Sequence, residues 1–205
     1  MPRANIRPVS RGVSGLVAQP GVFSGVFTKL ATPPKVHTRT SIQGEPVRGI
    51  AGGSAIHADL IRNVGFALHQ KLRGSPCSVK MTEMRLRVDA AGAVFYPDVL
   101  VHCSQPGSPA TTCELTEARL VIEVLSPTTQ HFDRGDKLAA YRQLAGLQHI
   151  LLISSMEPAA WHCQRVPEEG EWTELAPWPR GSRLELPGLG VALDWDEVYA
   201  GVGLG

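Results

Sequence analysis

Three ionisable side chains stand where packing alone would not place them: two lie inside apolar runs, and the third opens the apolar part of a predicted helix. Asp98 follows Tyr96-Pro97 in the run VFYPDVLV, Glu123 interrupts ARLVIEVLSP, and Lys137 lies in FDRGDKLAAYRQL. Two carboxylates can hold Mg²⁺ or Mn²⁺, which activates water and stabilises charge on a phosphodiester. A lysine beside them can orient or deprotonate that water, or neutralise the developing charge. These residue types are therefore suited to metal-dependent hydrolysis of phosphodiester bonds.

Glu123 is the strongest of the three signals. The apolar residues around it extend over five or six positions and end before Pro127, which is the pattern of a buried strand. An isolated buried carboxylate costs several kcal/mol or becomes neutral through a raised pKa, so it implies a partner. A divalent metal and Lys137 are the two candidates. The alternative is a glutamate at a strand end that is hydrogen-bonded or wet.

Asp98 and Lys137 each allow a purely structural interpretation when taken alone. An aspartate after a proline is typical of a turn or a strand edge, and Lys137 could form a surface pair with Asp133, worth about 0.3–0.5 kcal/mol. The catalytic interpretation is favoured because Asp98 and Glu123 both lie on predicted core strands. The helix that carries Lys137 also follows directly on the strand of Glu123, and the same helical face carries Tyr141.

Length and composition are those of one globular domain. The 205-residue chain is 43% hydrophobic and contains no apolar run near the roughly 18 residues of a membrane span, so we expect a soluble protein. The net charge of +1 hides an asymmetry, because six of the 20 basic residues and none of the 19 acidic residues precede Glu45. The remainder has 14 basic and 19 acidic residues and a net charge of −5. That balance is unlike a strongly basic nucleic-acid-binding surface.

Several familiar site patterns are absent from the sequence. The four cysteines (Cys77, Cys103, Cys113 and Cys163) form no CxxC motif and no Cys/His spacing of a zinc site. We expect reduced thiols in a cytoplasmic protein rather than a disulfide framework. No GxSxG, HExxH or P-loop pattern occurs, which argues against a hydrolase acting on other substrates.

The hydrophobic pattern predicts an α/β domain with a mixed sheet and helices on its faces. Apolar positions at i, i+3 and i+4 predict an amphipathic helix from Ser54 or Asp59 to about Leu72. Residues 79–88 alternate like a half-buried strand and should form a hairpin with 94–101. The other predicted elements are strands 44–50, 118–125 and 148–154, a helix from Thr129 or Asp133 to Ala145 capped by Gly146, a hairpin of 161–165 with 172–175, short strands 184–186 and 191–193, and a last helix from Asp194 to Tyr199.

Residues 1–43 differ from the rest of the chain. They are rich in Gly, Pro, Ser, Thr and Arg and show no persistent helical or strand period. We expect a divergent, poorly ordered segment at 1–43, followed by the structured domain at 44–205. A transit peptide and a basic arm for nucleic acid are alternatives that fit the same composition.

Four motifs together resemble one family of nucleases. YPDVLV, LVIEVLSPTT, DRGDKLAAYRQL and HILLIS are similar to the restriction endonucleases of the Uma-two family, within the PD-(D/E)XK nuclease superfamily, and GSPC and LELPGLGVAL match as well. The resemblance extends from about Gly44 to Val202. It implies a restriction-endonuclease-like mixed β-sheet flanked by helices. It also implies Mg²⁺- or Mn²⁺-dependent hydrolysis of phosphodiester bonds in DNA.

The resemblance assigns roles to individual residues. Asp98 matches the aspartate of the PD motif and Glu123 matches the second acidic metal ligand. The superfamily pattern places a lysine two residues beyond that acid, but this chain has Leu125 there. The resemblance therefore implies that Lys137, on the next helix, takes the lysine's role.

The chain departs from the family before the predicted domain. Relatives carry a further acid in an N-terminal stretch of which only Gly44-Glu45 is present here. Either Glu45 is a third metal ligand, or the site has one ligand fewer. His57 stands where many relatives carry a histidine, and it either contacts the site or caps the start of its helix.

Two functional hypotheses follow. The first is a Mg²⁺-dependent DNA endonuclease with Asp98, Glu123 and Lys137 as catalytic residues. The alternative is a catalytically inactive nuclease-fold protein that binds nucleic acid or serves as an assembly module, suggested by the divergent N-terminus and the acidic remainder. We expect DNA as the partner, no membrane association and a cytoplasmic location. A homodimer would supply the two sites that cutting both strands of a duplex needs.

Overall fold

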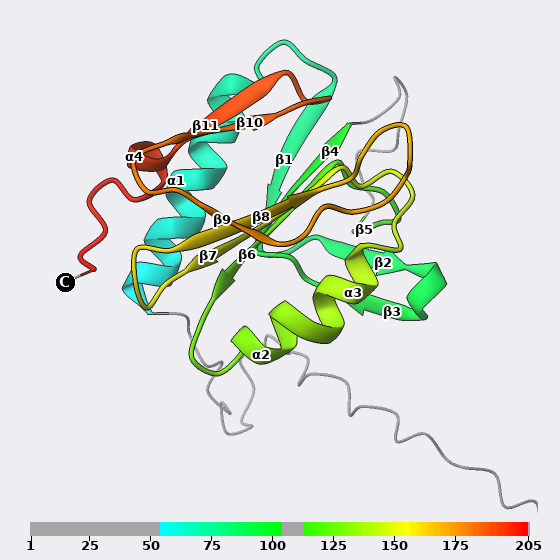
Figure 1. Ribbon diagram of the computed structural model, residues 1–205, viewed down its shortest axis with the longest axis horizontal. Coiled ribbons are helices and arrows are strands. Elements are labelled where there is room, and N and C mark those ends of the chain that lie inside the picture. Colours follow the sequence, from blue (N-terminus) through cyan, green and yellow to red (C-terminus); the bar gives the residue numbers. More distant parts are fainter. Residues whose placement is uncertain (1–53, 104–112, 205) are drawn as a thin grey trace, which may run out of the picture. The chain divides into compact units, whose positions relative to one another are not determined.

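The computed structural model describes residues 54–103 and 113–204, which are coloured along the chain in Figure 1. The predicted domain boundary at residue 44, the predicted strand 44–50 and Glu45 lie outside the described residues, so these three expectations stay predictions. No helix within the described ranges is long and apolar enough to cross a bilayer.

A six-stranded mixed sheet forms the centre of the fold. Its strand order is β1-β4-β6-β7-β8-β9, and only the β6–β7 pair is parallel. The strands are β1 (Cys77–Met81), β4 (Val99–Cys103), β6 (Leu120–Leu125), β7 (His149–Ser154), β8 (Ala160–Gln164) and β9 (Ala176–Trp178). Every residue of β6 and β7 is buried, which explains their nearly continuous apolar sequence.

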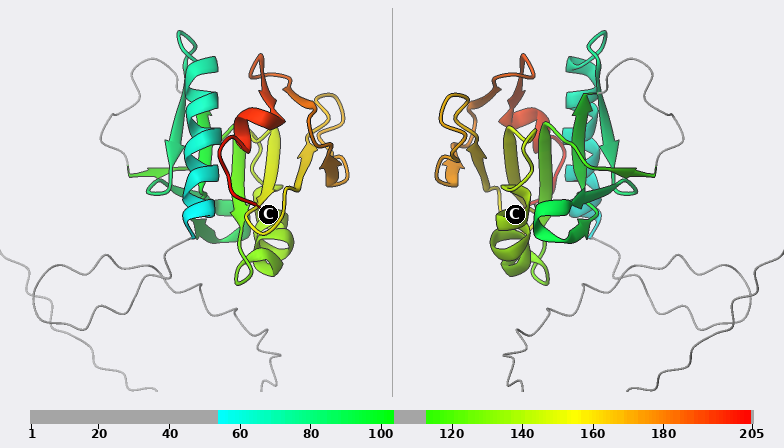
Figure 2. Two further views of the ribbon diagram at one scale, coloured as in Figure 1. Left: turned by 90° about the vertical axis from the view of Figure 1, so that its left-hand side faces the viewer. Right: turned by 90° about the vertical axis from the view of Figure 1, so that its right-hand side faces the viewer.

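One face of this sheet is covered by α1 (Ala55–Lys71), α4 (Trp195–Val198) and the hairpin of β10 (Arg183–Leu186) with β11 (Val191–Asp194). Figure 1 shows these elements together, and the side views of Figure 2 show α1 running alongside the strands. The Ser54 side chain caps α1 by accepting the His57 N–H at 3.2 Å, as its sequence predicts. Leu60, Val64 and Leu68 form its buried stripe.

The opposite face packs against a helical segment and a small second sheet. The segment consists of α2 (Gln130–Phe132), a π-helical turn η2 (Asp133–Lys137) and α3 (Leu138–Tyr141). The second sheet has the order β3-β2-β5, with β2 (Arg85–Val88), β3 (Ala93–Phe95) and β5 (Glu114–Leu115), and a 3₁₀ turn η1 (Asp89–Ala91) joins β2 to β3. A second buried cluster fills the space between these elements and the large sheet. The predicted mixed sheet with flanking helices is confirmed.

The prediction of one strand over residues 79–88 is wrong. The chain leaves the large sheet after β1 and enters the small one at β2, with Thr82 at a φ of 52° in between. Strand 94–101 also divides into β3 and β4, because Pro97 has no N–H to donate to a ladder. The predicted hairpin exists as β2 with β3, whereas β4 pairs with β1.

Two later boundaries also differ from the prediction. The helix expected to reach Ala145 ends at Tyr141, because Arg165 and the Trp172 indole donate to the carbonyl of Arg142 from a distant hairpin. The strand that follows β8 in the sheet is β9 and not the predicted residues 172–175. Those residues contribute a single bridge, between Arg165 and Trp172.

The expectation of four reduced thiols is wrong for two of the cysteines. Cys77 and Cys103 form a disulfide, while Cys113 and Cys163 are free. The antiparallel register of β1 and β4 places Cys77 directly opposite Cys103. That register depends on how the strands pair, so the spacing of cysteines along the sequence did not reveal it.

Candidate active site

Glu123 is buried on the central strand β6, with 2% of its surface exposed. Alternate residues of a strand face the same way, so its side chain shares the face of Val121 and Leu125, which pack toward the helical segment. Glu123 therefore lies neither at a strand end nor in contact with bulk water, which were the alternatives. Its polar partners must therefore come from the elements that cover this face.

Two side chains of the helical segment bind the two oxygens of Glu123. The Tyr141 hydroxyl donates to Oε1 at 2.7 Å, and the Lys137 ammonium lies 2.8 Å from Oε2. Lys137 Nζ also donates to Asp133 Oδ1 at 3.2 Å, and Asp133 and Lys137 are both buried. The Asp133–Lys137 pair is thus an interior pair and not the surface pair that was the alternative.

The π-helical turn η2 spans the residues from Asp133 to Lys137. Such turns are rare and occur frequently at functional sites, because one wider turn changes which side chains face inward. Tyr141 lies four residues beyond Lys137, and its ring packs edge-on against Phe95 with centroids 5.1 Å apart. The turn and this aromatic contact together aim Lys137 and Tyr141 at Glu123.

Asp98 reaches the same place from the start of β4. Its Oδ2 accepts the backbone N–H of Val124 at 2.7 Å, and Val124 directly follows Glu123. The pairing of Val99 with Ile122 fixes this alignment of β4 against β6. The two carboxylates are therefore held at neighbouring positions of adjacent strands.

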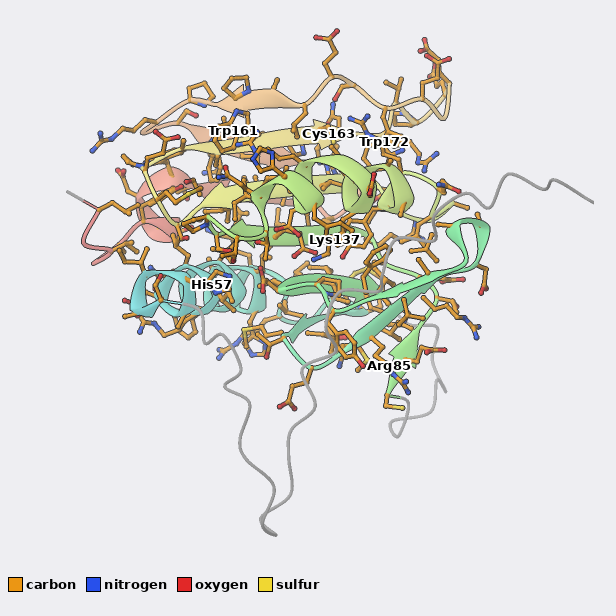
Figure 3. All side chains as sticks on the ribbon, turned by 90° about the horizontal axis from the view of Figure 1, so that it is seen from below. His57, Arg85, Lys137, Trp161, Cys163 and Trp172 are labelled. Carbon is orange, nitrogen blue, oxygen red and sulfur yellow. A yellow bond between two sulfur atoms is a disulfide. The ribbon has the colours of Figure 1, made fainter. Side chains whose placement is uncertain are left out.

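His57 approaches Asp98 from the first turn of α1. Its Nε2 lies 3.6 Å from Asp98 Oδ2, while its backbone N–H belongs to the Ser54 cap. Contact with the Asp98 carboxylate raises the pKa of His57 despite the opposing effect of burial. The His57 ring thus contacts Asp98, whereas the residue that caps the start of α1 is Ser54 and not His57. Figure 3 looks at this end of the molecule and labels His57 and Lys137.

The electrostatics of the cluster favour an additional cation. Burial raises the pKa of Glu123 to about 7, with the charges of Asp98 and Asp133 adding to the effect and Lys137 opposing it. Burial lowers the pKa of Lys137, but the carboxylates of Glu123 and Asp133 outweigh it and leave that pKa raised. One lysine thus faces three carboxylates.

The donor set fits a hard divalent metal ion. Asp98 and Glu123 offer carboxylate oxygens, the ligand type that Mg²⁺ and Mn²⁺ prefer. Within residues 54–103 and 113–204, no three or more His, Cys, Asp or Glu side chains form a ready-made metal cage. Mg²⁺ ordinarily takes one or two carboxylates and completes its shell with water and substrate phosphates, so two ligands suffice.

The structure brings Asp98, Glu123 and Lys137 together, and their catalytic roles stay predictions. Glu45, the candidate third ligand, lies outside the described residues. Asp133 and Tyr141 were not predicted as site residues. The signal for both was their spacing of four residues on either side of Lys137, which placed all three on one helical face.

Comparison with known proteins gives a consistent result. The family model Uma2, described as "Putative restriction endonuclease", matches residues 26–196. Two uncharacterized proteins of Synechocystis sp. (strain ATCC 27184 / PCC 6803 / Kazusa) are similar. The protein slr1290 is 30% identical over 76% of this chain and 80% of its own length, and sll1609 is 34% identical over 65% and 76%, respectively.

A solved structure shares the fold. It is the crystal structure of a "putative nuclease belonging to DUF820" from Anabaena variabilis ATCC 29413. The TM-score is 0.57 at 15% sequence identity, and the match covers 72% of this chain and 82% of the other. At this identity the match shows the fold alone. The family model, in contrast, matches most of the chain, so the chain belongs to the Uma2 family of nucleases and has a restriction-endonuclease-like fold.

Proposed function

We propose that the protein is a metal-dependent DNA endonuclease whose metal ligands are Asp98 and Glu123. The observation that carries the proposal is the bond from the Val124 N–H to Asp98 Oδ2, because it holds the two carboxylates at neighbouring positions. Family membership supports a hydrolase acting on phosphodiester bonds. Glu45 is proposed as a further ligand from outside the described residues.

A bound Mg²⁺ or Mn²⁺ would supply Lewis acidity, lowering the pKa of a water molecule and stabilising charge on the phosphate. The protein's own contribution is to orient the carboxylates. The Tyr141 hydroxyl and the Lys137 ammonium hold Glu123 in one orientation, and the Val124 amide does the same for Asp98. Held groups need no reorganisation when charge develops in the transition state.

Lys137 is suited to stabilising negative charge. Its raised pKa keeps it protonated at neutral pH, so it is a donor and not a base there. Two of its three donor positions face Glu123 and Asp133. The third meets no acceptor among the residues that the structure describes, and we propose that it donates to the attacking water or to a phosphate oxygen.

The first test is calorimetric titration of Mg²⁺ and Mn²⁺ into the full chain and into an Asp98→Ala/Glu123→Ala variant. A Glu168→Ala/Glu169→Ala variant is the matched control, because it removes two carboxylates from an exposed turn. We expect binding by the wild type and the control and none by the site variant. Cleavage of plasmid DNA should follow the same order, with a loss of at least 100-fold in the site variant.

The inactive alternative makes the opposite prediction. It expects that the folded wild-type chain binds neither metal and does not cut DNA. The protein would then be an inactive nuclease-fold protein that binds nucleic acid or acts as an assembly module. Cleavage retained by the site variant would remove Asp98 and Glu123 from the mechanism.

The substrate proposal has two corollaries. We propose the cytoplasm, a compartment that holds DNA, as the place of action. Cutting both strands of a duplex implies a homodimer, which would bring two copies of the site to one target.

A further inference from the structure

An arginine and a tryptophan form a stacked pair on the helical segment next to Lys137. The guanidinium carbon of Arg134 lies 3.6 Å from the centre of the Trp161 ring, within cation–π distance. Both side chains are partly buried. Burial lowers the pKa of Arg134 and the charge of Glu157 opposes this, yet no ion pair joins these two residues. Across the described part of the chain, the Arg134 guanidinium has no hydrogen bond to any protein group.

The second Arg–Trp pair of the molecule differs in that respect. Arg165 lies 4.9 Å over Trp172, and its N–H groups donate to four carbonyl oxygens, those of Arg142, Leu144, Leu147 and Gly170. Arg165 is therefore a structural residue that closes the end of a helix. Arg134 also lies over a tryptophan ring, at the shorter distance of 3.6 Å, and its N–H groups have no acceptor among the described residues. Stacking fixes the plane of a guanidinium and leaves its edge available for an acceptor from outside.

The Arg134–Trp161 pair lies at the same end of the sheet as the candidate active site. Arg134 follows Asp133, which contacts Lys137. Trp161 is the second residue of β8 and lies just after the β7–β8 turn. Ser155 of that turn donates both its N–H and its hydroxyl to the carbonyl of Leu125, which lies two residues beyond Glu123. Figure 3 labels Trp161 with Lys137 and His57 in the view of this end.

We propose that Arg134, held flat by Trp161, binds a backbone phosphate of the DNA strand beside the phosphate that is cleaved. A planar guanidinium with a free edge matches two phosphate oxygens in a bidentate contact. The site accounts for how a chain with an acidic remainder contacts DNA, since it offers an unpaired cation where the substrate must lie. This inference rests on the proposed nuclease function.

The test measures DNA binding and cleavage by full-length Arg134→Gln, Arg134→Lys and Trp161→Phe. Binding to a fluorescent DNA duplex is followed by anisotropy over a salt series with a chelator present, and cleavage kinetics are measured in Mn²⁺. Arg183→Gln is the matched control, because Arg183 is exposed on β10 and pairs with Glu185 at 3.0 Å. Thermal melting of each variant establishes that it is folded.

We expect Arg134→Gln to weaken DNA binding about tenfold and to reduce the slope of log K against log salt by about 0.9, the loss of one phosphate contact. KM should rise by a similar factor while kcat changes less than about twofold, since the group acts in uniform binding. Arg134→Lys should recover part of the loss, because the charge returns without the planar fork. Trp161→Phe should fall between wild type and Arg134→Gln, and Arg183→Gln should match wild type.

Two negative outcomes have different meanings. If the wild type binds and cuts DNA but Arg134→Gln has the same affinity and salt slope, this inference is wrong and the proposed function stands. If the folded wild type neither binds DNA at low salt nor cuts it in Mn²⁺, both are overturned.

Discussion

Glu123, Lys137, Asp133 and Tyr141 form a buried polar cluster that packing alone does not require. Taking ions out of water costs several kcal/mol per ion, and apolar residues of similar size often replace buried ion pairs without loss of stability. Two acidic residues and one lysine in the interior therefore indicate a use other than stability. The raised pKa of Glu123 has the same significance, because burial and then the charges of Asp98 and Asp133 make its ionised form costly in the folded chain.

Replacing Lys137 tests how strongly the cluster depends on its one cation. Lys137→Met keeps the length of the side chain and leaves Glu123 and Asp133 without a counter-charge. We expect the free energy of unfolding in urea at pH 8 to fall by about 3 kcal/mol, as when one partner of a buried pair is removed. Lys71→Met is the control, since Lys71 pairs with Glu197 in a half-buried contact and should lose less than about 1 kcal/mol. Equal losses in the two variants would contradict the role of the buried cluster.

The pKa of Glu123 predicts a particular dependence of stability on pH. In the folded chain this pKa is raised from 4.5 to about 7, so the native state binds more protons than the unfolded state between those values. Stability from this group is therefore greatest below the unfolded pKa and is lost as pH rises toward the folded pKa, by about 3 kcal/mol in total.

Glu123→Gln isolates this effect because glutamine does not titrate. We expect the unfolding free energy of the wild type, measured in the presence of a chelator, to decline relative to the variant as pH rises from 4.5 to 7. A difference that stays constant or changes in the opposite direction would show that Glu123 is already ionised at acid pH.

At the level of elements, local patterns predicted most of the fold. Of the two predicted starts of helix α1, Ser54 is correct and Asp59 is not, and the predicted end at about Leu72 is correct to within a residue, because the apolar stripe and the Ser54 cap are local signals. The central strand β6 was found because its apolar run is bounded by Pro127. Asp194 likewise marked the start of α4, where the structure adds a capping box with Glu197.

The errors arose where distant contacts decide the structure. Residues 79–88 alternate in the way one strand would, but the chain passes from one sheet to another there. The end of α3 is set by hydrogen bonds that the Arg165 and Trp172 side chains donate to the carbonyl of Arg142. For the site, Asp98 and Glu123 were identified by their apolar surroundings, whereas the bonds of Tyr141 to Glu123 and of Asp133 to Lys137 depend on how the helical segment packs against the sheet.

The disulfide between β1 and β4 leads to a prediction for these two elements. It joins an edge strand of the sheet to its neighbour across a sequence separation of 26 residues. Opening a loop of this length should lower the free energy of unfolding by about 3 kcal/mol. We expect Cys103→Ser and reduced wild type to show the same loss in urea, and denatured oxidised protein to show two free thiols, those of Cys113 and Cys163. Four titratable thiols in the oxidised protein would contradict the bridge.

The whole molecule has few features of a general DNA-binding protein. Residues after the first 44 carry 14 basic and 19 acidic side chains, and the candidate site itself has more carboxylates than cations. Long-range attraction to DNA is weak for such a charge balance. If the protein binds DNA as proposed, affinity should therefore depend on local contacts, namely the proposed metal ion at Asp98 and Glu123 and the proposed phosphate contact of Arg134.

The number of sites per molecule decides how a duplex is cut. Each chain has one candidate site in the residues that the structure describes, so under the proposed function a monomer would cut the two strands in separate encounters. A homodimer can cut both before release. If the proposed dimer forms, supercoiled plasmid should convert directly to linear DNA, and the rate should rise with the square of protein concentration below the dimerisation constant.

Sedimentation equilibrium at the same concentrations measures the mass independently. We expect twice the chain mass wherever linear product forms without a nicked intermediate. Nicked circles that accumulate before linear DNA, together with the mass of a single 22.1 kDa chain, would show a monomeric nicking enzyme. In that case the geometry of Asp98, Glu123 and Lys137 would still account for the chemistry, because each site is built within one chain.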